Sequence, residues 1–484
     1  MAIIGECLEI RIWLNRIILI LLAWVTLFSA GCDSISNLQN SSSKGCKECH
    51  PVKLEPFHDF PCEQCHGGDP SGRTMAQAHT DLVPCPASPA LSSRNCGSCH
   101  GEMELSARNS PHYQLPSHID ILFHAFWGPE TEPPAPEELQ AYSHPETARQ
   151  VVEDLLARRC LRCHPYWEGD NYAATHHGAG CAACHLVSGH RFVKEPPEER
   201  CLSCHRQNFT GWDFVGRFEK DLPAEYRAPL RKGQHLTRLY GVEWLPTQMD
   251  VHKQAGLSCL SCHGSASFHP GIKAGQTLHR NKACIDCHRE MVGKDRFHSQ
   301  DLLDRASCQV CHAVWQPLDL STYLVRQDDP DLDEWAFLAV QGSSEVENAI
   351  RMGGPAVMAN KFSGRNYPGL WFKSYGYRRF EYVAIGMDEN GKLWPVRPLL
   401  DISISYLDSD DDLVLDGFRP EYAGSLPMRP AMRRIFLFPA AVRDQLPLPE
   451  PGAWLPFAPH SIGPADLERT LFVLSFLDFP LTHK

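Results

Sequence analysis

Hydrophobic and polar positions follow a helical period in residues 146–159 of this 484-residue chain. The aliphatic residues on one side of the helix that this period predicts are Val151, Val152, Leu155 and Leu156. The helix follows an acidic, Pro-rich run, residues 128–138, with the sequence GPETEPPAPEE. A run of this composition is typical of a linker, so we interpret residues 128–159 as a linker and a helix.

The chain beyond residue 316 has a different pattern. Residues 379–395 contain two hydrophobic runs around the turn sequence Asp388-Glu-Asn-Gly391, which predicts a β-hairpin. Apolar residues alternate in residues 401–407, which predicts a further strand. Residues 466–479 predict a closing helix. We therefore expect a β-containing domain at the C-terminal end of the chain.

The N-terminal segment has the pattern of an export signal. Arg11 and Arg16 precede an apolar run, Ile17 to Phe28, that is too short to span a bilayer comfortably. Small residues then lead to Gly31-Cys32, as in a lipoprotein cleavage site. We interpret Cys32 as the lipidated N-terminus of the mature protein. A plain secretory signal and an uncleaved anchor remain the alternatives.

The most specific pattern in the chain is a repeated pentapeptide, C-x-x-C-H. It occurs nine times and uses 18 of the 21 cysteines. In chain order, motifs 1 to 9 are Cys46/Cys49/His50, Cys62/Cys65/His66, Cys96/Cys99/His100, Cys160/Cys163/His164, Cys181/Cys184/His185, Cys201/Cys204/His205, Cys259/Cys262/His263, Cys284/Cys287/His288 and Cys308/Cys311/His312.

This pentapeptide is the attachment signature of a c-type haem. Two cysteines three positions apart lie on one face of a helical turn, so both can bond the vinyl groups of one porphyrin. The following histidine then binds the iron from the proximal side. Zinc is the alternative, because paired C-x-x-C elements build tetrahedral sites. Zinc requires no histidine after each pair, and nine pairs cannot be grouped two by two. We therefore expect nine covalent haem c groups.

Haem attachment also predicts the fold. The motifs span 267 residues, which is too little chain per haem to bury an ordinary core, so the haems must form the core. We expect a multihaem cytochrome c fold, mostly irregular, with short α-helices wrapped around a haem chain and a haem-free β-containing C-terminal domain. The predicted parts are 1–31, a lipoprotein signal peptide; 32–45, a tether; 46–127, an N-terminal three-haem module; 128–159, an acidic Pro-rich linker and helix; 160–315, a six-haem module; and 316–484, the haem-free β-containing domain.

The net charge and the number of histidines limit the partners and the iron ligands that this chain can have. The formal net charge is −12, and haem propionates would make it more negative, which argues against nucleic acid as a partner. Of 25 histidines, nine belong to the motifs and sixteen remain, enough for a second histidine on every iron. Methionine could replace a few of these ligands, although it more often serves in packing. The methionines considered are Met75, Met103, Met249 and Met291.

The segment from His176 to Trp315 resembles the large multihaem c-type cytochromes of anaerobic respiring bacteria, many of which are exported as lipoproteins. The residues that carry the resemblance are His177-Gly-Ala-Gly-Cys181-Ala-Ala-Cys184-His185, Gly189-His190, Asp250-Val-His252 and His312-Ala-Val-Trp315-Gln-Pro317. In such proteins a histidine shortly before a motif is commonly a distal ligand, often of another haem. The resemblance therefore implies these distal ligands: His112, His177 (or His176), His190, His252, His279 and His298.

The chain departs from these relatives after Trp315, because Asp319 to Tyr323 lacks the further motif expected there. Pro459-His460-Ser461 resembles a segment that leads to a last motif, but no cysteine follows it. The C-terminal domain would then have lost its haems. His460 is either a ligand or a structural histidine. His269 is either a distal ligand or a surface or haem-propionate contact.

Two functions remain open at this point. With imidazole on both faces of each iron, no site is free for substrate, so the first is electron transfer in anaerobic respiration, with no catalytic residue. The second is a multihaem reductase of a small oxyanion, nitrogen or sulfur compound with one open haem. The expected location is the periplasm, outer membrane or cell surface, with a lipid anchor at Cys32. The expected partners are other cytochromes, an inner-membrane donor and an outer-membrane conduit; a homo-oligomer or filament is left open.

Overall fold

The structure is a computed structural model, and our structural statements concern the residues that it describes. These are residues 45–114, 116–128, 130–206, 211–220, 238–270, 282–328, 342–352, 354–380, 382–398, 402–407, 413–415, 432–438 and 454–479. The predicted signal peptide, Cys32 and most of the tether lie outside them. The chain divides into two compact units, residues 1–86 and 87–484. The division falls between motifs 2 and 3, which the sequence grouping had placed in one module.

The first unit is built from single helical turns. Its elements are η1 (Gly45–Glu48), η2 (Pro56–His58), α2 (Cys62–His66) and α3 (Met75–Ala78). Motif 1 begins in η1, and motif 2 forms α2. None of these elements contains a buried residue. This matches a segment too short to form an apolar core of its own.

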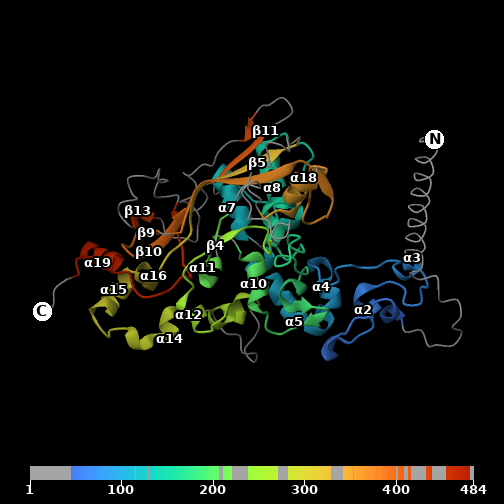
Figure 1. The fold of residues 1–484 in the computed structure, drawn as a ribbon, viewed down its shortest axis with the longest axis horizontal. Helices are drawn as coiled ribbons and strands as arrows, with labels where there is room; N and C mark the ends of the chain where they lie inside the picture. Colours follow the sequence, from blue (N-terminus) through green and yellow to red (C-terminus); the bar gives the residue numbers. More distant parts are fainter. Residues whose placement is uncertain are drawn as a thin grey trace, which may run out of the picture. The chain divides into compact units, whose positions relative to one another are not determined.

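In the second unit, short helices carry the motifs (Figure 1). They are α5 (Gly97–Arg108), η4 (Cys160–Cys163), α9 (Ala182–His185), α10 (Glu198–Cys204), α13 (Cys259–Cys262), α14 (Cys284–Cys287) and α16 (Cys308–His312). Other helical segments are α4 (Pro89–Asn95), α6 (Pro111–Gln114), α7 (Pro116–Trp127), η3 (Pro136–Glu138), α8 (Ala148–Arg158), α11 (Trp212–Val215), α12 (Val251–Gln254), η6 (Ser265–Ser267), η7 (Arg289–Met291), η8 (Arg296–His298), α15 (Gln300–Arg305), α18 (Ser344–Met352) and α19 (Leu467–Phe476).

Strands are few among the described residues of the motif region. There, β1 (Leu186–Ser188) pairs with β2 (Arg191–Phe192), and β3 (Arg217–Glu219) pairs with β4 (Trp244–Pro246). The longer strands follow motif 9. They are β5 (Leu318–Gln327), β6 (Val357–Ala359), β7 (Asn366–Pro368), β8 (Leu370–Arg379), β9 (Val383–Asp388), β10 (Leu393–Pro398), β11 (Ile402–Leu407), β12 (Leu413–Leu415), β13 (Met432–Phe438) and β14 (Trp454–Pro456).

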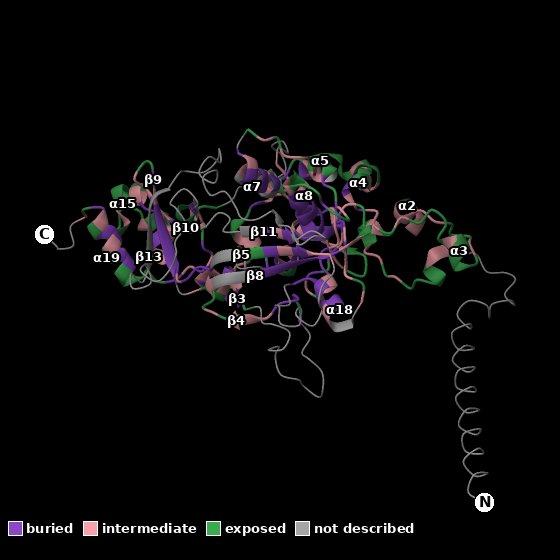
Figure 2. Ribbon diagram, turned by 90° about the horizontal axis from the view of Figure 1, so that it is seen from above, coloured by how far each residue is buried: buried purple, intermediate pink, exposed green. Residues whose placement is uncertain are grey.

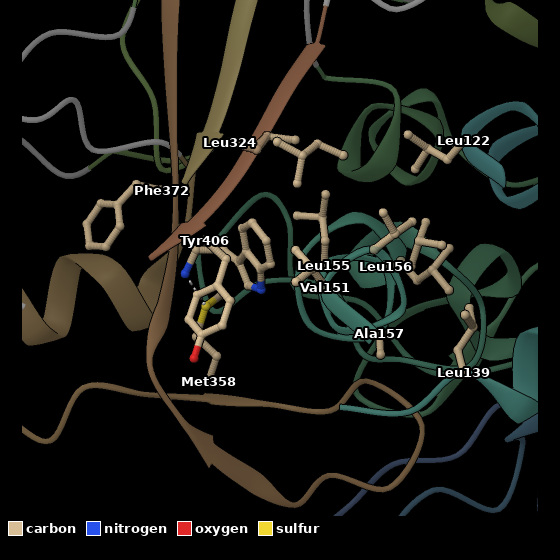
Figure 3. Packing of buried hydrophobic residues seen from close by; sticks show 14 of the residues in the cluster. Leu122, Leu139, Val151, Leu155, Leu156, Ala157, Leu324, Met358, Phe372 and Tyr406 are labelled. Atoms are coloured by element: carbon tan, nitrogen blue, oxygen red, sulfur yellow. Dashed lines mark hydrogen bonds between the residues drawn. The ribbon is translucent and has the colours of Figure 1, made fainter. Parts of the chain in front are cut away.

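One apolar core joins the helix before motif 4 to the first C-terminal sheet, whose strand order is β12-β11-β5-β8 (Figure 3). In this sheet β11 runs parallel to β5, and β8 runs antiparallel to it. The helix predicted for residues 146–159 is confirmed as α8, with Thr147 as its N-cap. The four aliphatic side chains predicted on one face are fully buried, and Leu155 packs in the same cluster as Trp371 of β8. Apolar burial therefore fixes the segment before motif 4 onto the sheet.

A second core lies under the other sheet, with strand order β13-β9-β10-β14. The predicted hairpin is confirmed: β9 and β10 pair antiparallel, with Met387 opposite Leu393. The strand predicted at 401–407 is β11, and the closing helix is α19, which Asp466 caps at the Arg469 N–H. Residues of α15, α16 and α19 pack against β9 and β10, and Figure 2 shows β9 as buried along nearly all of its length. Motif 9 is thus anchored by protein-only structure.

Three aromatic residues between motifs 6 and 7 pack on each other. Trp212, Tyr240 and Trp244 meet edge to face with ring centroids 5.4–5.9 Å apart. Such pairs stabilise a core beyond their buried area. No helix in the described part of the chain is both long and apolar enough to cross a bilayer.

Candidate haem centres

All nine motifs lie in the described residues, and no disulfide joins the cysteines there. In motif 8, one helical turn begins at Cys284 and ends at Cys287, and His288 is its C-cap. Motif 7 has the same form, from Cys259 to His263. Both attachment sulfurs and the histidine therefore belong to a single turn, as covalent haem attachment requires.

Motifs 1 and 3 depart from this form. Cys49 lies just beyond the end of η1, and α5 is interrupted at His100, whose φ of −116° and ψ of 38° are not helical. Cys49, Cys99 and His100 are also exposed, as are both cysteines of motif 8. Exposure leaves these sulfurs accessible for thioether formation.

Six motif histidines face a second histidine from elsewhere in the chain. In the first unit His50 faces His79, with 6.0 Å between ring centroids. The pairs of the second unit are His205–His112 at 6.3 Å, His185–His269 at 6.2 Å, His288–His252 at 6.1 Å, His263–His460 at 6.1 Å and His312–His298 at 6.2 Å.

This spacing matches two imidazoles on opposite faces of one iron. A ring nitrogen lies about 1.1 Å from its centroid and binds a first-row metal at about 2.0 Å, so the two centroids should be about 6.2 Å apart. Rotation of either ring about the N–Fe–N axis does not change this spacing. The interplanar angles of 28° to 80° are therefore compatible with it. The residues present fit bis-histidine haem.

Backbone carbonyls bind the Nδ1 atoms of several of these histidines. Among proximal histidines, His185 Nδ1 lies 2.7 Å from Val193 O, and His312 Nδ1 lies 3.1 Å from Gly463 O. His66, whose motif is not among the six pairs above, has the same arrangement, with Nδ1 3.0 Å from Val83 O. A partner at Nδ1 fixes the ring orientation and leaves Nε2 for iron, as is usual for metal-binding histidines.

Three of the histidines that face a motif instead have a carboxylate at Nδ1. His252 Nδ1 lies 3.0 Å from Asp250 Oδ1, and His298 Nδ1 lies 3.0 Å from Asp295 Oδ1. His460 Nδ1 lies 3.5 Å from Asp213 Oδ2.

Asp213 is buried and ionised. Burial raises the pKa of this carboxyl, but the attraction of His460 and hydrogen bonds from His460 and Phe214 outweigh it, and the pKa lies below its usual value. Negative charge therefore stands directly behind a candidate iron ligand.

The structure places the predicted distal histidines in three different situations. His112, His252 and His298 each face a motif histidine. His177 is buried, with Nδ1 2.8 Å from Gly178 O and Nε2 3.6 Å from Cys204 Sγ. His190 is exposed in the turn between β1 and β2, with a φ of 66°. His279 lies outside the described residues.

Sequence reasoning favoured histidines before a motif, and it did not consider His79, which follows motif 2 and faces motif 1. His269 and His460 had been left undecided; His269 follows motif 7 and faces motif 5, and His460 faces motif 7. A search for histidines after each motif would have included His79 and His269, because both lie within fourteen residues of one.

Other histidines make different contacts. His164 of motif 4 stacks on Tyr166, and its Nε2 lies 3.1 Å from Tyr113 O. His58 pairs with Glu55, and His144 Nδ1 lies 3.4 Å from Asp328.

Motif 4 lies in buried and strongly charged surroundings. Arg162, inside the motif, pairs with Asp170 and donates to Gly342 O at 2.7 Å. Arg206 Nη1 lies 3.6 Å from Cys163 Sγ. Burial, and then repulsion by Arg162, lower the pKa of Arg159 to about 10. Motif 4 therefore lies beside a buried ion pair.

Attachment cysteines of different motifs lie near one another. Cys46 lies near Cys62 in the first unit, and in the second unit Cys96 lies near Cys181, Cys163 near Cys204, Cys201 near Cys259 and Cys284 near Cys308. Cys184 also lies in the neighbourhood of Cys204, and Cys287 in that of Cys262. Haems attached at these cysteines would have neighbouring edges.

Comparisons of this chain with protein-family models, with curated proteins and with solved structures found no match.

Proposed function

We propose that this protein is an electron-transfer cytochrome with nine covalently attached haem c groups, most of them bound by two histidines. The observation that carries the proposal is the set of six histidine pairs with ring centroids 6.0–6.3 Å apart. Each pair joins a motif histidine to one that lies at least 14 residues away in the sequence. Stacking between two uncharged rings gives no reason for this recurrent composition, whereas axial ligation of one iron requires it.

The proximity of attachment cysteines supports an order for the haems, numbered after their motifs. Each attachment cysteine would bond a porphyrin edge, so two neighbouring cysteines would bring two porphyrin edges near each other. In the second unit this gives the sequence 3–5–6–7–8–9, in which haem 4 meets haem 6 through Cys163 and Cys204. The relay is therefore branched at haem 6. In the first unit, haems 1 and 2 form their own pair through Cys46 and Cys62.

The work of the chain is to hold the imidazoles and to set the charge around each iron. The haem supplies one-electron chemistry when bound. Carbonyls such as Val193 O and carboxylates such as Asp250 orient the histidine rings. With imidazole on both faces, an iron exchanges electrons without binding a substrate. The proposed setting is an exported protein anchored through Cys32, which receives electrons from an inner-membrane donor and passes them to another cytochrome or an outer-membrane conduit.

Magnetic spectroscopy of the purified holoprotein tests this proposal. Electron paramagnetic resonance of the oxidised protein should show low-spin haems with bis-imidazole signals, and the reduced protein should bind carbon monoxide little. A stoichiometric high-spin haem that binds nitrite or hydroxylamine would instead favour the multihaem reductase.

A further inference from the structure

The proposed distal histidines of haems 7, 8 and 9 have a different kind of group at Nδ1 from the proposed distal histidine of haem 5. Aspartates stand at the Nδ1 atoms of His460, His252 and His298. A backbone carbonyl, Met103 O, stands 3.2 Å from Nδ1 of His269, the distal histidine of haem 5. A carboxylate carries a full negative charge and a carbonyl only a partial one, so these haems have different electrostatic surroundings.

We propose that Asp250 and Asp213 are potential-setting residues, which make haems 7 and 8 a low-potential step inside the relay. The inference rests on the bis-histidine ligation proposed above. Oxidised iron carries one more positive charge than reduced iron, so a nearby anion stabilises the oxidised form and lowers the reduction potential. The effect is large where water cannot screen it.

Asp250 acts on two distal ligands at once. It is 2% exposed, and its Oδ1 lies 3.0 Å from His252 Nδ1. Its Oδ2 accepts a hydrogen bond from the Ile462 N–H at 2.7 Å, which brings the segment around His460 to the same carboxylate. The Asp250 charge also reaches His460 itself. One buried anion therefore stands beside the distal ligands of both haem 7 and haem 8.

Asp213 adds a second buried charge at haem 7. Its side chain is 1% exposed, and its Oδ2 accepts from the His460 N–H at 2.7 Å, close to the His460 ring. Its other oxygen accepts from the N–H groups of Gly211 and Phe214, both at 3.1 Å. These donors stabilise the ionised carboxylate in a position where it cannot turn away.

Asp295 provides a natural comparison at haem 9. Its Oδ1 lies 3.0 Å from His298 Nδ1, the same distance as in the Asp250 pair. Its side chain is 44% exposed, however, so water screens its charge. Haem 9 should therefore have a higher potential than haem 8. Electrons passing between haem 9 and haem 6 would have to cross an energetically uphill step at haems 8 and 7.

The test is a potentiometric titration, followed optically, of the nine-haem holoprotein and its D250N variant. Asparagine has the shape of aspartate and is an equally good N-cap, so the first turn of α12 is kept while the charge is removed. We expect the components assigned to haems 7 and 8 to shift to higher potential. At a fixed potential, the ratio of reduced to oxidised haem should rise about tenfold, which corresponds to about 59 mV.

D295N is the matched control, because it removes the same charge at the same distance from an exposed position. It should change the ratio for haem 9 by less than about threefold. D213N provides a second variant if D250N does not fold, and it should shift haem 7 alone. An unchanged titration in D250N and D213N, with low-spin haems intact, would overturn this inference. Wild-type protein without bis-imidazole signals would instead overturn the proposed function.

Discussion

His460 faces His263 of motif 7 with 6.1 Å between ring centroids, although it lies in the C-terminal part of the chain. Two buried aspartates from the motif region hold the segment around it. Asp213 accepts a hydrogen bond from the His460 N–H, and Asp250 accepts one from the Ile462 N–H, both at 2.7 Å. The cysteine-free end of the chain thus contributes to a candidate haem centre that lies far earlier in the sequence.

Replacement of His460 tests this contribution. His460→Ala should leave haem 7 with only His263, because the facing imidazole is removed. One haem should become high-spin in the oxidised protein, and one carbon monoxide site should appear in the reduced protein. A fully low-spin variant with its haem content intact would mean that His460 is structural.

His252→Ala should have the same effect at haem 8, where His252 faces His288 at 6.1 Å. The change in spin state and carbon monoxide binding can be measured by visible absorption spectroscopy. His144→Ala is the control, because the His144 side chain is 77% exposed and pairs with Asp328. If His252→Ala kept the wild-type spectrum, as the control should, the assignment of His252 as a ligand would be wrong.

Haem stoichiometry is the third prediction. Nine complete motifs should give a mature protein whose intact mass includes nine covalent haems. Mass spectrometry under denaturing conditions measures this directly, because thioether-linked haem stays on the chain. A count of eight or fewer would show that at least one motif is not used.

Export is tested at Cys32. If this cysteine is lipidated, Cys32→Ser should move the protein from the membrane fraction to the soluble fraction. Fractionation followed by haem staining measures the change. Membrane retention of the variant would favour an uncleaved anchor over a lipoprotein.

The protein-only core should be sensitive to cavities. Leu155 in α8 is fully buried, so Leu155→Ala should lower the free energy of unfolding by about 2–5 kcal/mol. Leu467→Ala, at a position 71% exposed, should change it by less than about 0.5 kcal/mol. Denaturant titration followed by circular dichroism compares the two. Equal effects would show that α8 does not depend on this core.

Local chemistry was readable from the sequence alone. The motif from Cys284 to His288 occupies one turn, so its attachment geometry depends on spacing rather than on distant contacts. The helix α8 and the hairpin of β9 and β10 were predicted from local periodicity and turn residues for the same reason. Three of the histidines that face a motif were also predicted, from a resemblance.

Only the tertiary structure decided which histidine faces which motif. His252 lies shortly before motif 7 but faces His288 of motif 8, and His269 follows motif 7 but faces His185 of motif 5. Sequence proximity carries no such information, because each facing imidazole comes from a separate turn whose position is fixed by packing. The same holds for His460. Hydrogen bonds to two buried aspartates from the motif region hold its segment beside motif 7. The spacing of residues along the chain determines which segments can attach a haem. The tertiary structure determines which second histidine faces each motif histidine.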